Sequence, residues 1–445
     1  MRNKLKKSLK SPRNELLYRI KQTIDHFIPE WRACFDNIAD YRGNQATYVM
    51  SEILLASVFM FLFKQGSRNQ MNEDREEAQF KSNYKALFGL KLPHMDTVSD
   101  VMNKLSPQHL ESIRCHIIKY LLNKRSLHKF RLMGKYFSVA IDGSGIYTYA
   151  KEPYPNCPYK TSKKGKKTWY QNVLEAKIVC SNGFSISIGT EWLKNEDGHT
   201  KQDCEQKALK RLLDHLKRDY PRLPICILLD GLFACAPVME KIKNKGWEFI
   251  IVWKDGKLKK IQEQLVDLRL EGAVACIKKE EINNHKIKTD HLYEFSKTTL
   301  CHKEHKFYYI KHSLQILDVK SKSVKDKKRF ICISSLVPNG ENIKELTQTG
   351  RMRWKIENEG FNSQKNQGMN LQHKYVRSNF TGIRNYYMCM QIAHIIEQLF
   401  VLSKNLIMKG WKTLKGMWLH LWAYFLMVPL QDYPYTKKTK LNYRF

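Results

Sequence analysis

Two short apolar runs of this chain each end in the dipeptide Asp-Gly. The first, residues 139–143, reads Val-Ala-Ile-Asp-Gly, and the second, residues 227–231, reads Ile-Leu-Leu-Asp-Gly. Runs of this length and composition are typical of buried strands, and each stops where an acidic side chain would emerge from the sheet. Either Asp-Gly alone is an ordinary turn signal. Because both follow apolar strands, we expect Asp142 and Asp230 to lie at one edge of a single sheet.

A third acid lies far downstream, in a polar stretch that reads Arg-Trp-Lys-Ile-Glu at residues 353–357. The apolar spacing predicts one long helix from 341 to about 365. Arg353 and Glu357 share a face of such a helix, whereas Glu359 points about 200° away from Glu357. We therefore expect Glu357 to face the aspartates, with Arg353 orienting it or holding a phosphate. An ordinary intrahelical Arg–Glu pair is the alternative.

Three converging carboxylates favour divalent metal, because like charges within a few ångströms repel unless a cation lies between them. Two metals about 3.5 to 4 Å apart can activate an oxygen nucleophile, neutralise charge at phosphorus and stabilise the leaving oxygen. We expect Asp142, Asp230 and Glu357 to bind two Mg²⁺ ions, with Mn²⁺ able to replace them and Asp142 as the bridging ligand. The glycine after each aspartate would let backbone and substrate approach closely.

The charge of the chain indicates a polyanionic partner. Its 445 residues include 77 lysines and arginines against 43 acids, a formal net charge of +34. Nucleic acid is the polyanion that such a surface and such metals would serve. One basic run occupies the loop between the first two predicted strands, where we expect it to lie close to Asp142 and hold DNA phosphates. Its members are Lys160, Lys163, Lys164, Lys166 and Lys167; a merely solvated loop is the alternative.

Other features bound the class of protein. Eleven cysteines stand singly, which suits reduced thiols better than a disulfide framework. The first residues lack the apolar segment of a secretory signal, and the longest apolar run, 53–63, is shorter than the ~20 residues of a membrane span. We therefore expect a soluble, cytoplasmic protein.

A loose cluster of histidines and one cysteine raises a zinc site as a weaker alternative. Its spacings match no standard zinc module, and much of the segment alternates as a strand would. The cluster comprises His285, His291, Cys301, His302, His305 and His312.

The order of predicted elements indicates an α/β fold with a helical N-terminal part. Residues 1–130 read as an α-helical domain that would bind DNA, with a packing scaffold as the equally good alternative. Residues 131–402 read as three strands, a helix, then alternating strand and helix, the order of a ribonuclease-H-like mixed sheet with flanking helices. A β-rich insertion over 256–325 interrupts it. Residues 403–445 read as a C-terminal helical segment and basic tail.

On these residues the chain resembles the DDE transposases of bacterial insertion sequences, in particular those whose core is split by a β-rich insertion. The resemblance covers about 136–402 and rests on Asp142, Asp230 and the 353–357 motif. It implies that the three acids hold two magnesium ions, that DNA is cut at terminal inverted repeats, and that the freed 3′-hydroxyl joins target DNA. It also implies a homodimer on paired transposon ends, in a bacterial cytoplasm at the nucleoid.

The chain departs from that group at two positions. The group usually has a tyrosine three residues before the arginine and a lysine seven after the glutamate, where this chain has Gly350 and Gln364. Lys365, one residue further on, is the remaining candidate for the DNA-binding lysine. Two other functions stay open: a ribonuclease-H-like nuclease that cuts without joining, and a catalytically inactive DNA-binding protein.

Overall fold

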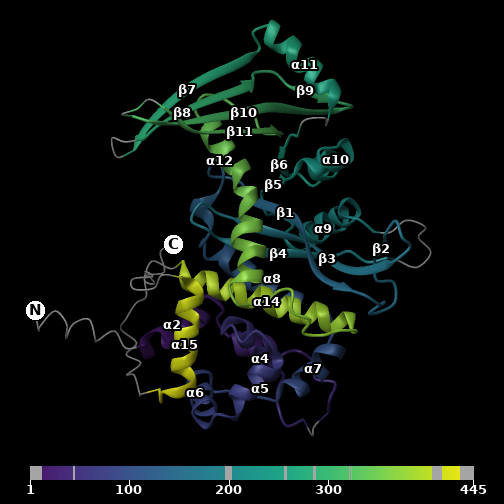
Figure 1. The fold of residues 1–445 in the computed structure, drawn as a ribbon, viewed down its shortest axis with the longest axis vertical. Helices are drawn as coiled ribbons and strands as arrows, with labels where there is room; N and C mark the ends of the chain where they lie inside the picture. The colour runs from purple at the N-terminus through teal and green to yellow at the C-terminus, as the bar shows by residue number, and fades with distance from the viewer. Residues whose placement is uncertain are drawn as a thin grey trace, which may run out of the picture.

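The molecule is elongated, with helices at one end, a sheet in the middle and a β-rich unit at the other end (Figure 1). This architecture is seen in a computed structural model that describes residues 13–43, 46–195, 203–254, 258–283, 287–319, 321, 323–402 and 413–430. The predicted mixed sheet with flanking helices is confirmed. Within these ranges no helix combines the length and apolarity that crossing a bilayer requires. All eleven cysteines are free thiols.

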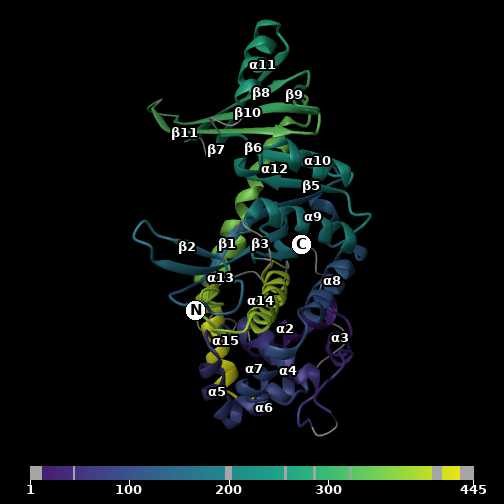
Figure 2. The ribbon, with the colours of Figure 1, turned by 90° about the vertical axis from the view of Figure 1, so that its right-hand side faces the viewer.

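The helical end is built from both ends of the chain. Its largest element, α14 (Phe380–Val401), is buried along most of its length and contacts α4, α7 and α8 on one side and strand β4 on the other. Helix α15 (Leu414–Met427) packs on α2 and α6 (Figure 2). The N-terminal helices are α2 (Arg13–Phe27), α3 (Trp31–Asp36), α4 (Met50–Leu62), α5 (Arg68–Glu76), α6 (Ala78–Phe88), α7 (Met95–Lys104) and α8 (Pro107–Asn123).

The central sheet has the order β4-β3-β1-β5-β6-β11. Neighbours among β4, β3 and β1 are antiparallel, β1, β5 and β6 are parallel, and β11 is antiparallel to β6. The strands are β1 (Phe137–Tyr149), β2 (Tyr159–Thr161), β3 (Lys167–Val179), β4 (Ser185–Trp192), β5 (Ile225–Leu229), β6 (Glu248–Val252) and β11 (Val324–Ser334). Strand β1 continues well past the aspartate at which the sequence predicted its end, because β3 pairs with its second half.

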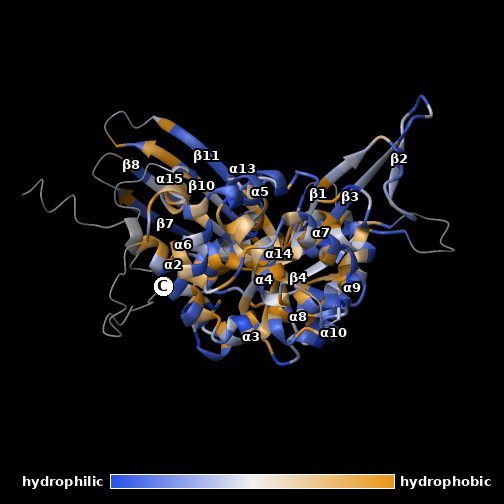
Figure 3. Ribbon diagram, turned by 90° about the horizontal axis from the view of Figure 1, so that it is seen from below, coloured by the Kyte–Doolittle hydropathy of each residue, from blue (hydrophilic) through white to orange (hydrophobic). Residues whose placement is uncertain are grey.

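Helices cover both faces of this sheet. Successive strand residues point to opposite faces. On β4, Gly189 lies against Leu212 and Leu216 of α9 (Glu205–Asp219), whereas the Thr190 hydroxyl accepts a hydrogen bond from Arg114 of α8. Helix α10 (Ala236–Asn244) packs on β6. The apolar strands are therefore buried from both sides, and Figure 3 shows hydrophobic residues concentrated among these elements.

The chain between β6 and β11 forms a second sheet that is continuous with the first. Strand β11 pairs with β6 at its C-terminal end and with β10 over most of its length. Beyond β10 the order continues to β8 and β7, and β9 pairs with β10. The elements are α11 (Lys259–Leu270), β7 (Val274–Asn283), β8 (Ile287–Ser296), β9 (Leu300–His302) and β10 (His305–Asp318). The strand character predicted for this segment is observed. Its sheet is joined to the core sheet by the hydrogen bonds between β11 and β6.

A buried ion pair joins the N-terminal helices to α14. The Lys64 ammonium, just after α4, lies 2.8 Å from a carboxylate oxygen of Glu397, and both side chains are 3% exposed. Burial lowers the pKa of Lys64, and the Glu397 carboxylate raises it in part. Each charge is therefore tolerated in the interior because the other is present.

We predict that Glu397→Leu lowers the free energy of unfolding by about 3–5 kcal/mol, because it leaves a buried ammonium without its partner. Chemical denaturation measures this. The double variant Lys64→Met/Glu397→Leu should regain most of the loss, since neither charge is then buried. A single-variant cost below about 1 kcal/mol would show that the pair does not support the helical end.

Candidate active site

The two aspartates lie at the same level on adjacent parallel strands. The register pairs Ala140 of β1 with Leu228 of β5, so Asp142 and Asp230 each follow two residues later. Parallel neighbours in register are about 5 Å apart and point to the same face. The structure therefore brings the two aspartates close together, as the sequence predicted, although Asp142 lies within β1 and only Asp230 follows the end of its strand.

Each aspartate is held by one basic side chain. Arg353 Nη1 donates to Asp142 Oδ2 at 3.0 Å, and the guanidinium is 5% exposed. Lys254, directly beyond β6, places its ammonium 2.9 Å from Asp230 Oδ1. The backbone amide of the following glycine donates to the carboxylate in both cases. The two acids are thus balanced by protein cations.

A fourth carboxylate, that of Glu205, completes the cluster. Glu205 is the first residue of α9, and its carboxylate occupies the space that a Cβ at position 143 would need. Gly143 therefore makes room for this acid; the sequence had led us to expect room for backbone and substrate. The sequence reasoning missed Glu205, although a glutamate in the first turn of the helix that follows three strands was the available signal.

Gly231 has the corresponding role at the second aspartate. A Cβ there would meet the Lys254 side chain at 3.1 Å and the Val252 carbonyl oxygen at 3.0 Å. The aliphatic part of Lys254 therefore runs across Gly231 to reach Asp230. Both glycines of the Asp-Gly pairs admit a charged side chain next to the acid.

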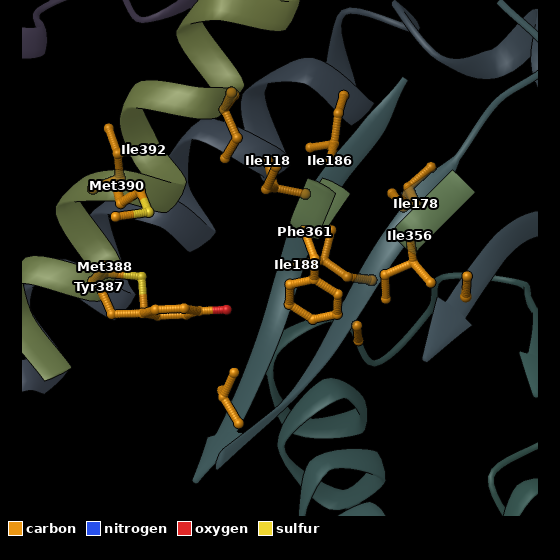
Figure 4. Close-up of a cluster of buried hydrophobic side chains, with 14 of the residues drawn as sticks. Ile118, Ile178, Ile186, Ile188, Ile356, Phe361, Tyr387, Met388, Met390 and Ile392 are labelled. Carbon is orange, nitrogen blue, oxygen red and sulfur yellow. The ribbon is translucent and has the colours of Figure 1, made fainter. Parts of the chain in front are cut away.

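The predicted continuous helix over 341–365 is wrong in its geometry. The chain forms α12 (Ile343–Arg351), a 3₁₀ turn η3 (Met352–Trp354), a π-helix η4 (Ile356–Asn362) and α13 (Ser363–Asn366). Ile356 and Phe361 would be about 140° apart on an α-helix. In the π-helix both are fully buried on one face, against β3 and β4, as Figure 4 shows.

The π-helix is packed over a buried lysine. A Cβ at Gly360 would lie 3.4 Å from Lys177 Nζ and 3.2 Å from Ser185 Oγ, so this turn of backbone rests directly on β3 and β4. The Lys177 side chain is fully buried and donates to Gln391 at 3.3 Å. Tertiary contact with these strands is the physical reason for the departure from a regular helix.

The two glutamates of this segment have different electrostatic surroundings. The charge of Glu357 raises the pKa of Asp142. Glu359 accepts from Lys355 at 3.0 Å, within its own helical segment. The predicted orientation of Glu357 towards the aspartates stays a prediction, and the helical segment that carries both glutamates is irregular.

The environments of the two aspartates shift their acidities in opposite directions. Burial raises the pKa of Asp142; Arg353 and the Gly143 amide lower it, the charges of Glu357 and Asp230 raise it again, and the net shift is upward. Burial also raises the pKa of Asp230, but the Lys254 hydrogen bond, the Gly231 amide and Arg353 outweigh it, and the net shift is downward. Burial, then the charges of Asp142 and Asp230, raise the pKa of Glu205.

These carboxylates suit a hard divalent cation by their chemistry. Within the part of the chain that the structure describes, however, no three His, Cys, Asp or Glu side chains are grouped as a metal site. Arg353 and Lys254 supply the positive charge at the aspartates instead. The donor set fits Mg²⁺, and both ion pairs would have to open for an ion to bind.

The predicted basic loop lies far from the acids, which corrects its expected position. Strand β2 pairs with β3 at the end opposite Asp142, whose partner on β3 is Glu175. Lys167 is about 26 Å along β3 from Glu175 at the rise of a strand. The hairpin projects from the body of the molecule (Figures 2 and 3). Its five lysines, Lys160, Lys163, Lys164, Lys166 and Lys167, are exposed.

The departures at 350 and 364 have structural reasons. A Cβ at Gly350 would lie 3.0 Å from both Ile250 and Phe330, so a tyrosine has no room there. Gln364 is fully buried and donates to Gln391 at 2.8 Å. Lys365 is partly exposed, with its ammonium 5.9 Å from the centre of the Phe361 ring.

The positions of the histidines in the insertion do not support the alternative hypothesis of a zinc site. His291 Nδ1 lies 3.0 Å from His312 Nε2, and the two rings stack with Tyr293. His302 and His305 are register partners on β9 and β10, a separate pairing. The described members of this cluster form no group of three metal ligands, and His285 lies outside the described residues.

The likeness of this chain to known proteins is distant and structural. No protein-family model and no curated protein matches the chain. Among solved structures, the piggyBac transposase synaptic complex with hairpin DNA, determined by cryo-electron microscopy, aligns with 95% of this chain and 83% of its own. The TM-score is 0.39 and the sequence identity 12%.

The buried lysine beneath the π-helix makes a prediction about pH. Burial lowers the pKa of Lys177 to about 8, while Glu175 raises it in part. Below pH 8 the folded protein must bury a charged ammonium, and this cost fades as pH rises from 8 towards the ordinary value of 10.5. Lys177→Met should therefore raise the free energy of unfolding at pH 7, by of order 3 kcal/mol at most.

The difference between Lys177→Met and the parent protein should shrink between pH 8 and 10.5, as followed by chemical denaturation at each pH. Lys210→Met, at an exposed lysine of α9, is the control for net charge. A gain in the free energy of unfolding that stays the same up to pH 10.5 would contradict the prediction. An equal gain in Lys210→Met would also contradict it.

Proposed function

We propose that this chain is a DNA transposase of a bacterial insertion sequence, which cuts DNA at terminal inverted repeats and joins the freed strand to target DNA. One observation supports the proposal: Asp142 on β1 lies next to the end of β5, which Asp230 directly follows, and the charge of Glu357 raises the pKa of Asp142. Three acids from distant segments at one sheet edge suit metal-dependent phosphodiester chemistry. The formal charge of +34 suits DNA as the partner.

The sheet supports a ribonuclease-H-like core in this proposal. Its strands follow the order β4-β3-β1-β5-β6, with the antiparallel strands first in sequence and the parallel strands after them. The β-rich unit enters between β6 and β11, ahead of the helical segment with Glu357. In this proposal Glu357 is the third acid, and it follows the two aspartates after a long insertion in the chain.

In the proposed reaction Asp142, Asp230 and Glu357 would hold two Mg²⁺ ions. When bound, the ions would activate the attacking oxygen and stabilise the leaving oxygen. Arg353 would leave Asp142 to bind a phosphate of the cut strand, for which its planar donor group is suited. Glu205 adds negative charge at the same edge, which favours cation binding there. Two copies would hold paired DNA ends, in the bacterial cytoplasm.

Two alternatives use the same sheet edge. A nuclease of this fold would cut without joining, and an inactive protein would bind DNA without cutting. Incubating the protein with Mg²⁺ and labelled element-end DNA separates them: joined products support the proposal, cut ends alone support the nuclease, and intact DNA supports the binder. The DNA on either side of the coding sequence is the source of this substrate.

We predict that Asp142→Asn lowers the rate of strand cleavage on the order of 10³-fold while DNA affinity stays nearly the same. Glu357→Gln should have a similar effect. Glu359→Gln is the matched control and should stay within about threefold, because it removes only a partly buried ion pair with Lys355. Gel assays of cleavage and of binding give both quantities. Normal cleavage by Glu357→Gln with loss in Glu359→Gln would reverse the assignment.

We also predict that the projecting hairpin contacts DNA. Replacing Lys160, Lys163, Lys164, Lys166 and Lys167 with alanine should weaken binding and flatten its salt dependence by about 0.9 per lysine that meets a phosphate. Replacing the same five with arginine keeps the charge and should preserve the slope. An unchanged slope in the alanine variant would remove the hairpin from the DNA path.

A further inference from the structure

A basic groove lies where the second sheet meets the helical segment of the acid site. Its volume is about 620 Å³. The walls come from the end of β6, the middle of β11 and the segment that joins α12 to η3. The lining residues are Val252, Trp253, Lys254, Lys328, Arg329, Phe330, Ile331, Arg351 and Trp354. Four of the nine carry positive charge and none carries negative charge.

The cations of the groove come from three separate segments. Lys254 follows β6, Lys328 and Arg329 lie on β11, and Arg351 ends α12. They approach one another because β11 pairs with β6 and α12 packs across both strands. Lys254 and Lys328 each have an acidic partner, Asp230 and Asp326. The lining of the groove itself carries only positive charge, so it would attract an anionic ligand.

One apolar wall of the groove is exposed to solvent. The Trp354 side chain is 53% exposed although its neighbour in sequence, Arg353, is buried. The Arg353 guanidinium stacks on the Trp354 ring at 4.6 Å from its centre. A groove with cations and one exposed aromatic wall matches a chain of alternating phosphates and sugars better than it matches an isolated small anion.

The groove is continuous with the acid site through two contacts. Lys254, which lines the groove, holds Asp230. Trp354, on the other wall, adjoins the arginine that holds Asp142. A strand whose phosphates follow the groove would therefore reach the edge where both aspartates lie.

We propose that this groove binds the phosphates of one DNA strand next to the bond that is cut, and that Lys254 passes from Asp230 to a phosphate when the strand enters. The inference rests on the function proposed above and assigns that function a substrate subsite. It makes Lys254 a positioning residue: the same ammonium neutralises the acid in the free protein and the substrate in the complex.

Equilibrium binding to a random-sequence DNA duplex, over a series of salt concentrations without divalent metal, tests the groove. Lys328→Ala/Arg329→Ala removes two of its cations. Lys325→Ala/Lys327→Ala removes the same charge from the same strand at residues that do not line the groove. Each double variant removes one lysine that forms an ion pair: Lys328 with Asp326 in the groove variant, and Lys325 with Asp318 in the control. We expect the groove variant to flatten the salt dependence by about 1.8 and the control by less than half of that.

Lys254→Met provides an independent variant and should flatten the slope by about 0.9. Thermal unfolding of all three proteins shows whether they remain folded. Equal slopes in the groove variant and its control, or an unchanged slope in Lys254→Met, would overturn the inference while leaving the proposed function intact. Failure of the unaltered protein to bind DNA at all would instead refute the proposed function itself.

Discussion

Repulsion between carboxylates is the constraint on which the rest of this structure depends. The parallel pairing of β1 with β5 puts Asp142 and Asp230 side by side, and Glu357 and Glu205 add to the same edge. Unscreened like charges at such separations raise each other's pKa or force the site apart. The fold balances them with two backbone amides and with cations from two distant segments. The positions of η3 and of the residues after β6 follow from this need.

Glycines decide how closely those compensating groups approach. Gly143 leaves space for the Glu205 carboxylate, and Gly231 lets the Lys254 stem cross to its aspartate. Gly350 brings α12 against β6 and β11, and Gly360 sets the π-helix on β3 and β4. A side chain at any of the four would meet atoms within about 3.4 Å of its Cβ. These four positions are glycine because neighbouring atoms lie too close for a side chain, more than because the backbone needs flexibility there.

The sequence predicted the parts of the site that depend on local pattern. Each apolar run predicts a buried strand that leads to its aspartate, so Asp142 and Asp230 could be expected on neighbouring strands, although β1 continues beyond Asp142 to Tyr149. The π-helix could not be predicted from the sequence, because it depends on contacts with Lys177 of β3 and Ser185 of β4. Glu205 was not predicted because its contact with Gly143 joins α9 to β1, and no sequence pattern connects these two elements. The lysine hairpin was misplaced because the length of β1 and β3 is set by their mutual pairing.

The free protein and a DNA complex place opposite demands on the same cations. Without substrate, Arg353 stabilises Asp142 and Lys254 stabilises Asp230. Lys254 also lines the groove, and Arg353 adjoins it through its neighbour Trp354. A phosphate that draws either cation away leaves an aspartate uncompensated, and a divalent ion would then restore the balance. Conversely, an ion at the aspartates would release both cations for the strand. Binding of metal and binding of DNA are therefore expected to favour each other, because one pair of cations serves both.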